Sequence, residues 1–236
     1  MKKLKYRHEL KFLISEGEKE LIRERLQVIM KLDPHATNGE YHIRSLYFDD
    51  YWNSAYVEKM GGFSLRRKYR IRVYDLSDKI INLECKLKSG SYISKQSARL
   101  SPQEFQAIQK GDYAFLLKRE EHLCRDFYYQ CTSKVLRPRV IVDYEREPFM
   151  MEAGTVRVTF DKQVRAISPV SAFFSANLPC HYVLEPGKVV MEVKYTEFLP
   201  SIVKRVLPPR AAEFTAVSKY ALCYEKVEHL MAKTSF

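Results

Sequence analysis

In several segments of this chain, charged and apolar side chains alternate residue by residue. The clearest example is KYRIRVY (68–74), where a cation stands at every second position and aromatic or aliphatic residues fill the gaps. A β-strand points successive side chains to opposite faces, so this strand has one cationic face and one apolar face. The alternation therefore predicts a sheet whose two faces differ sharply in chemistry.

The same period of two recurs along the chain and predicts eight strands. They are expected at 5–14, 41–50, 65–75, 79–88, 91–100, 137–147, 154–164 and 188–195. An antiparallel set of eight strands can close into a barrel, which removes unpaired edges. The interior of such a barrel is just wide enough for side chains or one thin ligand.

Helix signals separate these strands. Ser15 and Glu18 form a capping box that starts a helix, and Ser101 with Pro102 and Glu104 starts a second, short one that Gly111 ends. Further expectations are a helix over 113–135 that is broken once, a loop over 165–187 and a long helix over 209–232. The predicted fold class is α+β, an eight-stranded antiparallel barrel forming a tunnel with flanking helices, as one domain over residues 1–236.

The alternation alone leaves open which face of the sheet points inward. In an ordinary sandwich the charged faces meet water. The apolar stripes of the helices offer an alternative, because they could cover the outside of a barrel and leave the charges in its lumen. Buried cations without counter-anions are strongly disfavoured, so such a lumen would be hydrated and would hold a polyanion.

The charge balance agrees with a polyanionic partner. Lys and Arg outnumber Asp and Glu by 40 to 29, which gives a formal net charge of +11. Nucleic acid, an anionic membrane and a phosphorylated small molecule are the candidate partners. A nucleic-acid-binding barrel needs aromatic residues interleaved with basic ones on an open face. Here Tyr and Phe mostly share the apolar register, so no nucleic acid is expected.

Cysteine usage and hydropathy bear on location. The five cysteines are odd in number and include no CxxC pair, which indicates reduced thiols. No signal peptide is recognisable, and no apolar run approaches the roughly 20 residues that span a bilayer. A cytoplasmic protein without a transmembrane segment is expected.

Eight short motifs occur in the order known from the triphosphate tunnel metalloenzyme (CYTH-like) superfamily. They are Glu9-x-Lys11, SLYFDD (45–50), YRIRVY (69–74), Glu84-x-Lys86, DYERE (143–147), VRVTFD (156–161), Glu192-x-Lys194 and FTAVSKY (214–220). Together they most resemble its VTC branch, the polyphosphate polymerase domain of the vacuolar transporter chaperone and its bacterial relatives. The resemblance implies a tunnel that binds a triphosphate or polyphosphate chain and a glutamate that holds Mn²⁺ or Mg²⁺.

The resemblance also implies roles for individual residues. Phosphate contacts are expected from Lys11, Arg70, Arg72, Lys86, Lys95, Arg139, Arg146, Arg157 and Lys219. Arg139 and Arg146 compete for one role, because the register of their strand is not fixed by sequence. The catalytic set is Lys11, Arg70, Arg72, Lys86, Glu192 and Lys219, and the metal-ligand set is Glu192, Glu84 and Glu9.

One departure from the family pattern narrows the expected activity. Hydrolytic CYTH-type members carry ExExK on the first strand, and here Arg7 replaces the first acid. This favours ATP-dependent polyphosphate synthesis by a phosphotransferase. Hydrolysis of inorganic tripolyphosphate or nucleoside triphosphates is the alternative, and non-catalytic polyphosphate binding is another. ATP or another triphosphate and inorganic polyphosphate are the expected ligands. No SPX sensor domain is recognisable, so a membrane-protein partner would be encoded separately.

Overall fold

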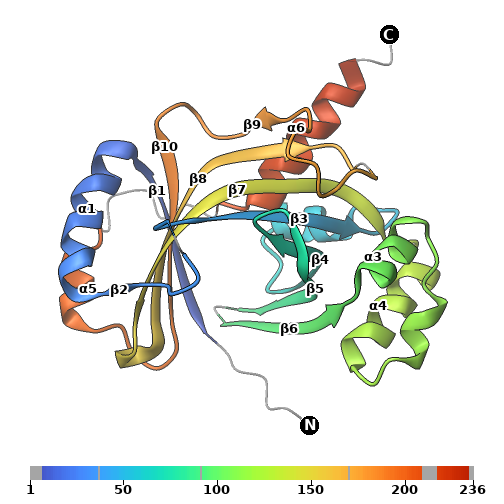
Figure 1. Cartoon of the computed structure of the whole chain (residues 1–236), viewed down its shortest axis with the longest axis horizontal. Helices are drawn as coiled ribbons and strands as arrows, with labels where there is room; N and C mark the ends of the chain where they lie inside the picture. Colours follow the sequence, from blue (N-terminus) through green and yellow to red (C-terminus); the bar gives the residue numbers. More distant parts are fainter. Residues whose placement is uncertain (1–6, 37, 91, 170, 209–216, 234–236) are drawn as a thin grey trace.

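The computed structural model describes residues 7–36, 38–90, 92–169, 171–208 and 217–233. Its main feature is a strongly bent antiparallel sheet of eight long strands (Figure 1). They are β1 (His8–Ser15), β3 (Tyr41–Asp49), β4 (Leu65–Tyr74), β5 (Ser77–Ser89), β6 (Tyr92–Leu100), β7 (Arg137–Met151), β8 (Val156–Ile167) and β10 (Lys188–Tyr195). The strand order is β1-β10-β8-β7-β3-β4-β5-β6. Two-residue strands β2 (Lys31–Leu32) and β9 (His181–Tyr182), which the sequence did not predict, pair with β7 and β8.

The two edge strands of this sheet, β1 and β6, meet at a single bridge. Arg7 and Ile93 exchange both backbone hydrogen bonds, at 3.0 Å and 3.2 Å. The sheet thus curls into a barrel-like tunnel, and within the described ranges Arg7 and Ile93 are the one residue pair that joins its edge strands. The predicted fold class, an antiparallel sheet of eight strands with flanking helices, is confirmed.

Two groups of helices cover the outer face of the sheet. Helices α1 (Glu16–Ile29) and α5 (Ser201–Val206) pack against strands β1, β10, β8 and β7 through apolar side chains such as Phe12, Leu26 and Phe160. Helices α3 (Pro102–Gln109) and α4 (His122–Ser133), with the short 3-10 turn η1 (Ala114–Lys118), cover strands β4 to β6. Both predicted capping boxes are present, at Ser15 and Ser101. The apolar strand faces therefore point outward, as predicted for a tunnel.

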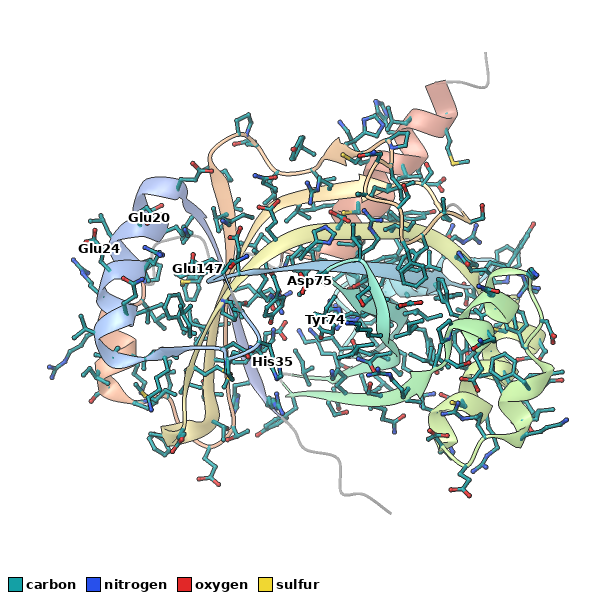
Figure 2. The ribbon with its side chains drawn as sticks, in the orientation of Figure 1. Glu20, Glu24, His35, Tyr74, Asp75 and Glu147 are labelled. Carbon is teal, nitrogen blue, oxygen red and sulfur yellow. The ribbon has the colours of Figure 1, made fainter. Side chains whose placement is uncertain are left out.

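Ion pairs also fasten α1 to the sheet. Glu147 of β7 lies beside α1 (Figure 2) and accepts a hydrogen bond from Arg23 Nε at 2.6 Å. Its second oxygen pairs with Lys19 Nζ at 3.0 Å. Because Glu147 is buried, these contacts satisfy a carboxylate that water cannot reach. Not every acid of the DYERE motif therefore belongs to the lumen.

The C-terminal helix α6 (Lys219–Lys233) lies on the inner face of the sheet, which corrects the expectation that every helix covers the outside. The ring of Tyr220 stacks on that of Tyr47 at 5.1 Å. Tyr47 shares its face with its cross-strand partner Arg70, whose Nη1 donates to the Tyr47 hydroxyl. Inner-face apolar residues of β7 and β8, among them Val142, complete this contact.

The bounds of the C-terminal helix also differ from the prediction. Residues 217 and 218 precede α6 and are not helical, and the predicted stretch 209–216 lies outside the described residues. Helices α2 (Ser54–Met60) and α5 were not predicted, because both are too short to show a clear apolar period. Among the described residues, no helix has both the length and the apolar character needed to cross a bilayer.

Candidate functional site

Strand pairing collects the predicted charges on one face. Lys11 of β1 lies opposite Glu192 of β10, and Glu192 in turn lies opposite Thr159 of β8. Residues directly opposite each other share a face, so the alternating charges of neighbouring strands form one wall. We call the result the lumenal cluster. Its cations are Lys11, Lys68, Arg70, Arg72, Lys86, Lys95, Arg146, Arg157, Lys194 and Lys219, and its carboxylates are Glu9, Glu84, Asp161 and Glu192.

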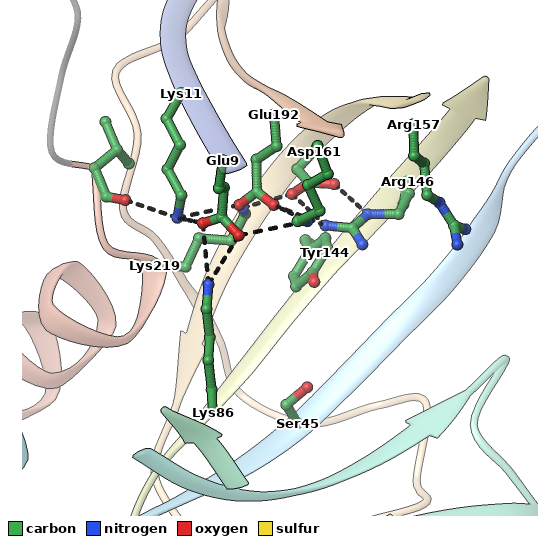
Figure 3. Close-up of polar contacts among 12 residues, drawn as sticks. Glu9, Lys11, Ser45, Lys86, Tyr144, Arg146, Arg157, Asp161, Glu192 and Lys219 are labelled. Carbon is green, nitrogen blue, oxygen red and sulfur yellow. Dashed lines mark hydrogen bonds and ion pairs between the residues drawn. The ribbon is translucent and has the colours of Figure 1, made fainter. Parts of the chain in front are cut away.

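Glu192 is the most heavily contacted carboxylate of this cluster. Its oxygens lie 3.2 Å from Lys11 Nζ, 2.5 Å from Lys194 Nζ and 2.9 Å from Lys219 Nζ (Figure 3). Burial by itself raises the pKa of Glu192, but these three ammonium groups and Arg146 hold it well below its usual range. Glu192 is therefore ionised at any physiological pH.

Asp161 stands beside Glu192 and shares a cation with it. Arg146 donates two hydrogen bonds to the Asp161 carboxylate, at 2.6 Å and 2.7 Å. Lys219 Nζ lies 2.5 Å from the same carboxylate and 2.9 Å from Glu192 (Figure 3). The first residue of α6 therefore ties the helix to two strands of the barrel.

Contacts across the lumen join its two walls. Lys86 of β5 donates to both oxygens of Glu9 of β1, each at 3.0 Å (Figure 3). On the β4–β5 side, Glu84 accepts from Arg70 Nε at 2.8 Å and from Lys95 Nζ at 2.6 Å. The side chains of distant segments thus converge on one central space, as the tunnel prediction requires.

Arg72 is buried and Lys68 is half-buried, and among the described residues both have only neutral partners. Arg72 is 6% exposed, and its guanidinium donates to Ser45 Oγ and to the Tyr144 hydroxyl, both at 3.0 Å. Lys68 Nζ donates to Ser218 Oγ at 3.1 Å and lies over the Tyr220 ring. No carboxylate of the described residues lies within ion-pair distance of either group. A buried charge of this kind is costly until an anion reaches it.

The excess of positive charge also perturbs the lysines. Burial, with Lys11 nearby, lowers the pKa of Lys86 to about 8 despite its contact with Glu9. Burial and the neighbouring cations hold the pKa of Lys68 well below its usual range. Burial also lowers the pKa of Lys194. By contrast, Asp161 and Glu192 outweigh burial and raise the pKa of Lys219.

Most residues singled out in the sequence meet in the lumenal cluster, and two lie elsewhere or at its margin. Of the two alternatives on β7, Arg146 faces the lumen, whereas Arg139 donates to the Asp50 carbonyl at 2.8 Å, away from the cluster. Arg157 lies at the margin, where it bonds Asp33 and the Tyr41 hydroxyl.

Sequence reasoning missed several members of the site. The alternation places Lys68, Asp161 and Lys194 on the charged strand faces, but they were not chosen as site residues. The hydroxyls of Tyr47 and Tyr144 carry no such signal, because tyrosines in a strand read as apolar.

Carboxylate pairs in the cluster could hold a divalent cation. Among the described residues no group of three or more His, Cys, Asp and Glu side chains is arranged as a metal site. Mg²⁺, however, is commonly bound through one or two carboxylates plus phosphate oxygens and waters. Two places in the cluster have two carboxylates close to each other. Glu192 and Asp161 both contact Lys219 Nζ, and Glu192 and Glu9 both contact Lys11 Nζ.

A polar atom beside Glu192 also lacks a partner. Thr159 Oγ1 is fully buried opposite Glu192 and has no hydrogen bond within the described structure. The donor set around Glu192 therefore fits a hard cation. Glu84 likewise has a cation on each oxygen, Arg70 and Lys95, but no orphaned hydroxyl like that of Thr159 lies opposite it on its neighbouring strands.

Comparison with known proteins agrees with this geometry. The sequence model of the VTC domain family matches residues 6–228. A structure of Hippeastrum HpAC1, named as a candidate adenylyl cyclase and described as having a dominant triphosphatase activity, shares the fold. Its TM-score is 0.54 at 13% identity, over 94% of this chain and 96% of that one. A Bacillus halodurans protein named as a candidate adenylate cyclase gives a TM-score of 0.49 at 14% identity, over 82% of each chain. No curated protein matches the sequence.

Proposed function

The chain belongs to the VTC domain family, and from this premise we propose that it catalyses metal-dependent phosphoryl transfer on a triphosphate or polyphosphate held in the lumenal cluster. The proposed direction is ATP-dependent synthesis of polyphosphate. The observation that carries the proposal is a pair of lumenal cations, the buried Arg72 and the half-buried Lys68, for which the described residues supply no carboxylate within ion-pair distance. Their charge is compensated once a chain of phosphates enters the lumen.

The lumenal residues have separable roles in this reaction. Arginines grip phosphate oxygens with a planar fork and keep their charge, so Arg70, Arg72 and Arg146 would fix the triphosphate. Phosphoryl transfer needs little covalent help from the protein; positioning and charge neutralisation supply most of the rate. When bound, Mn²⁺ or Mg²⁺ at Glu192 and Asp161 would neutralise charge on the phosphate oxygens.

In synthesis, a terminal oxygen of the growing chain attacks the γ-phosphorus of ATP, and the bond to the β-phosphate oxygen breaks so that ADP leaves. Hydrolysis is the second candidate, with water as the attacking group and orthophosphate as the product. The Hippeastrum protein that shares this fold is described as having a dominant triphosphatase activity, and this supports hydrolysis as the second candidate. Arg7, which stands where hydrolytic relatives carry an acid, favours synthesis.

Product analysis separates these activities. The purified protein is incubated with ATP and Mn²⁺ or Mg²⁺, and the products are resolved on a gel. We expect long phosphate chains together with ADP. Orthophosphate without chains would make the protein a hydrolase. Tight tripolyphosphate binding without turnover in the presence of either metal would indicate that the protein is a non-catalytic binding module.

Anion binding to the lumen is expected to depend on pH around the pKa of Lys86, about 8. A bound polyphosphate favours the protonated lysine, so binding takes up protons near this pH and weakens as the pH rises above it. Calorimetry of tripolyphosphate binding at about pH 8, in buffers of different ionisation enthalpy, measures the proton uptake. The variant Lys86→Arg keeps its charge and should lose this pH dependence. An unchanged profile in that variant would assign the titration to another group.

The cysteines agree with a cytoplasmic location, which we propose as well. All five are free thiols, and four of them are buried. Such thiols persist in a reducing compartment.

A further inference from the structure

Exposed apolar side chains concentrate in one stretch of the chain, residues 51–65, which comprises α2, its flanking loops and the first residue of β4. Tyr56 packs against the core, but six other large apolar side chains of the stretch are more than half exposed: Tyr51, Trp52, Val57, Met60, Phe63 and Leu65. Trp52 is the chain's only tryptophan and is 77% exposed. Apolar residues gathered in this way commonly mark an interaction site.

The 51–65 segment is held firmly in place. The buried Asp50 accepts hydrogen bonds from the backbone N–H groups of Trp52 and Ser54, at 3.0 Å and 2.9 Å. Asp49, also buried, accepts from Ala55 N–H at 2.9 Å and from the Tyr220 hydroxyl. Two buried carboxylates thus fix the backbone of the loop that carries Trp52. The exposure of the Trp52 side chain therefore follows from the fold.

The charges around these apolar residues are mostly positive. Residues 51–66 include Lys59, Arg66 and a single acid, Glu58, and Arg66 lies beside α2, where it donates to the carbonyls of Glu58 and Lys59. Arg67 points to the other face of β4, where it pairs with Asp126. The carbonyl of Lys134 accepts a hydrogen bond from Tyr51 N–H and brings a further exposed lysine alongside. The segment therefore combines aromatic and aliphatic groups with cations.

We propose that the 51–65 segment docks this protein on the surface of an anionic lipid bilayer. Trp and Tyr favour the bilayer–water interface, where an apolar ring lies against acyl chains and a polar edge stays hydrated. Lys and Arg side chains near an anionic surface add electrostatic attraction to it. Charge complementarity thus selects a lipid surface that carries negative headgroups. The contact is peripheral, through side chains of one short helix and its loops.

Trp52 itself reports on this docking. The full-length protein is mixed with phosphatidylcholine vesicles, or with vesicles that also contain phosphatidylglycerol, and tryptophan emission and co-sedimentation are recorded. We expect a blue shift and sedimentation with the anionic vesicles, weak binding to the neutral ones, and weakening at high salt because charge attraction is screened. No shift and no sedimentation with anionic vesicles would overturn the proposal.

Matched variants test whether this segment makes the contact. Phe63→Ser is expected to weaken vesicle binding roughly tenfold, because it removes a side chain worth about 1.5–3 kcal/mol on burial. Val28→Ser on α1, at a site 84% exposed, should bind as the parent does. Equal binding by both variants would contradict the proposal. So would an emission shift that follows protein concentration without vesicles, which would assign the segment to a contact between two copies of the chain.

Discussion

Replacing Glu192 by glutamine is expected to lower the rate of phosphoryl transfer by about 100-fold or more, the range seen when a preorganised electrostatic group is removed. Glutamine keeps the shape of the side chain but loses the charge that Lys11, Lys194 and Lys219 share. It also removes the strongest candidate ligand for a divalent cation. Steady-state rates with ATP at saturating Mn²⁺ or Mg²⁺ measure the loss.

Tripolyphosphate binding distinguishes this effect from a loss of structure. The neutral residue leaves the lumen more positive, so the affinity of Glu192→Gln for tripolyphosphate should be equal to or higher than that of the parent protein. Glu145→Gln is the control, because Glu145 lies on the opposite face of β7 from Tyr144 and Arg146. Full activity of Glu192→Gln would remove Glu192 from the reaction. Equal losses in both variants would indicate a general effect on the sheet.

Replacing Arg72 by methionine is expected to change stability and binding in opposite directions. Arg72 is a buried cation with no carboxylate within ion-pair distance in the described part of the chain, so an apolar side chain of similar length should raise the free energy of unfolding by roughly 1 kcal/mol or more. The same change should weaken tripolyphosphate binding roughly 30-fold to 150-fold, since charge-assisted hydrogen bonds are worth about 2–3 kcal/mol. Denaturant unfolding and calorimetry measure the two effects.

Arg146→Met is the matched control. Arg146 has a partner, and its loss leaves the buried Asp161 with Lys219 alone. Breaking a buried pair costs about 3–5 kcal/mol, so this variant should be less stable than the parent. If Arg72→Met were destabilised to the same degree and bound tripolyphosphate normally, Arg72 would be a structural residue and not an anion-binding one.

Much of this site follows from local rules that the sequence displays. Alternation in residues 68–74 predicts that Arg70 and Arg72 share a face, and their contacts confirm it. The capping boxes at Ser15 and Ser101 locate two helix starts to the residue, because the same side chains satisfy the free backbone N–H groups in any context.

Other features depend on pairings between distant segments. The register shifts where Asp143 and Glu145 face β8, and again near Tyr47 on the other side of β7. The extra residue lies on β8 in the first shift and is Arg139 of β7 in the second, so the alternation of β7 holds from Val140 to Arg146 and is interrupted at Arg139. The apolar stripe of α6 shows that one side of this helix is buried, but not that it packs on the inner face of the sheet against Tyr47.

The central claim is that the lumenal cations bind a chain of phosphates between the strands. A crystal structure of the protein with tripolyphosphate and Mn²⁺ tests it most directly. We expect phosphate oxygens within hydrogen-bond distance of Arg72 and Lys68, with the metal at Glu192. Tripolyphosphate bound only on the outer surface, with the lumenal ion pairs intact, would contradict the account.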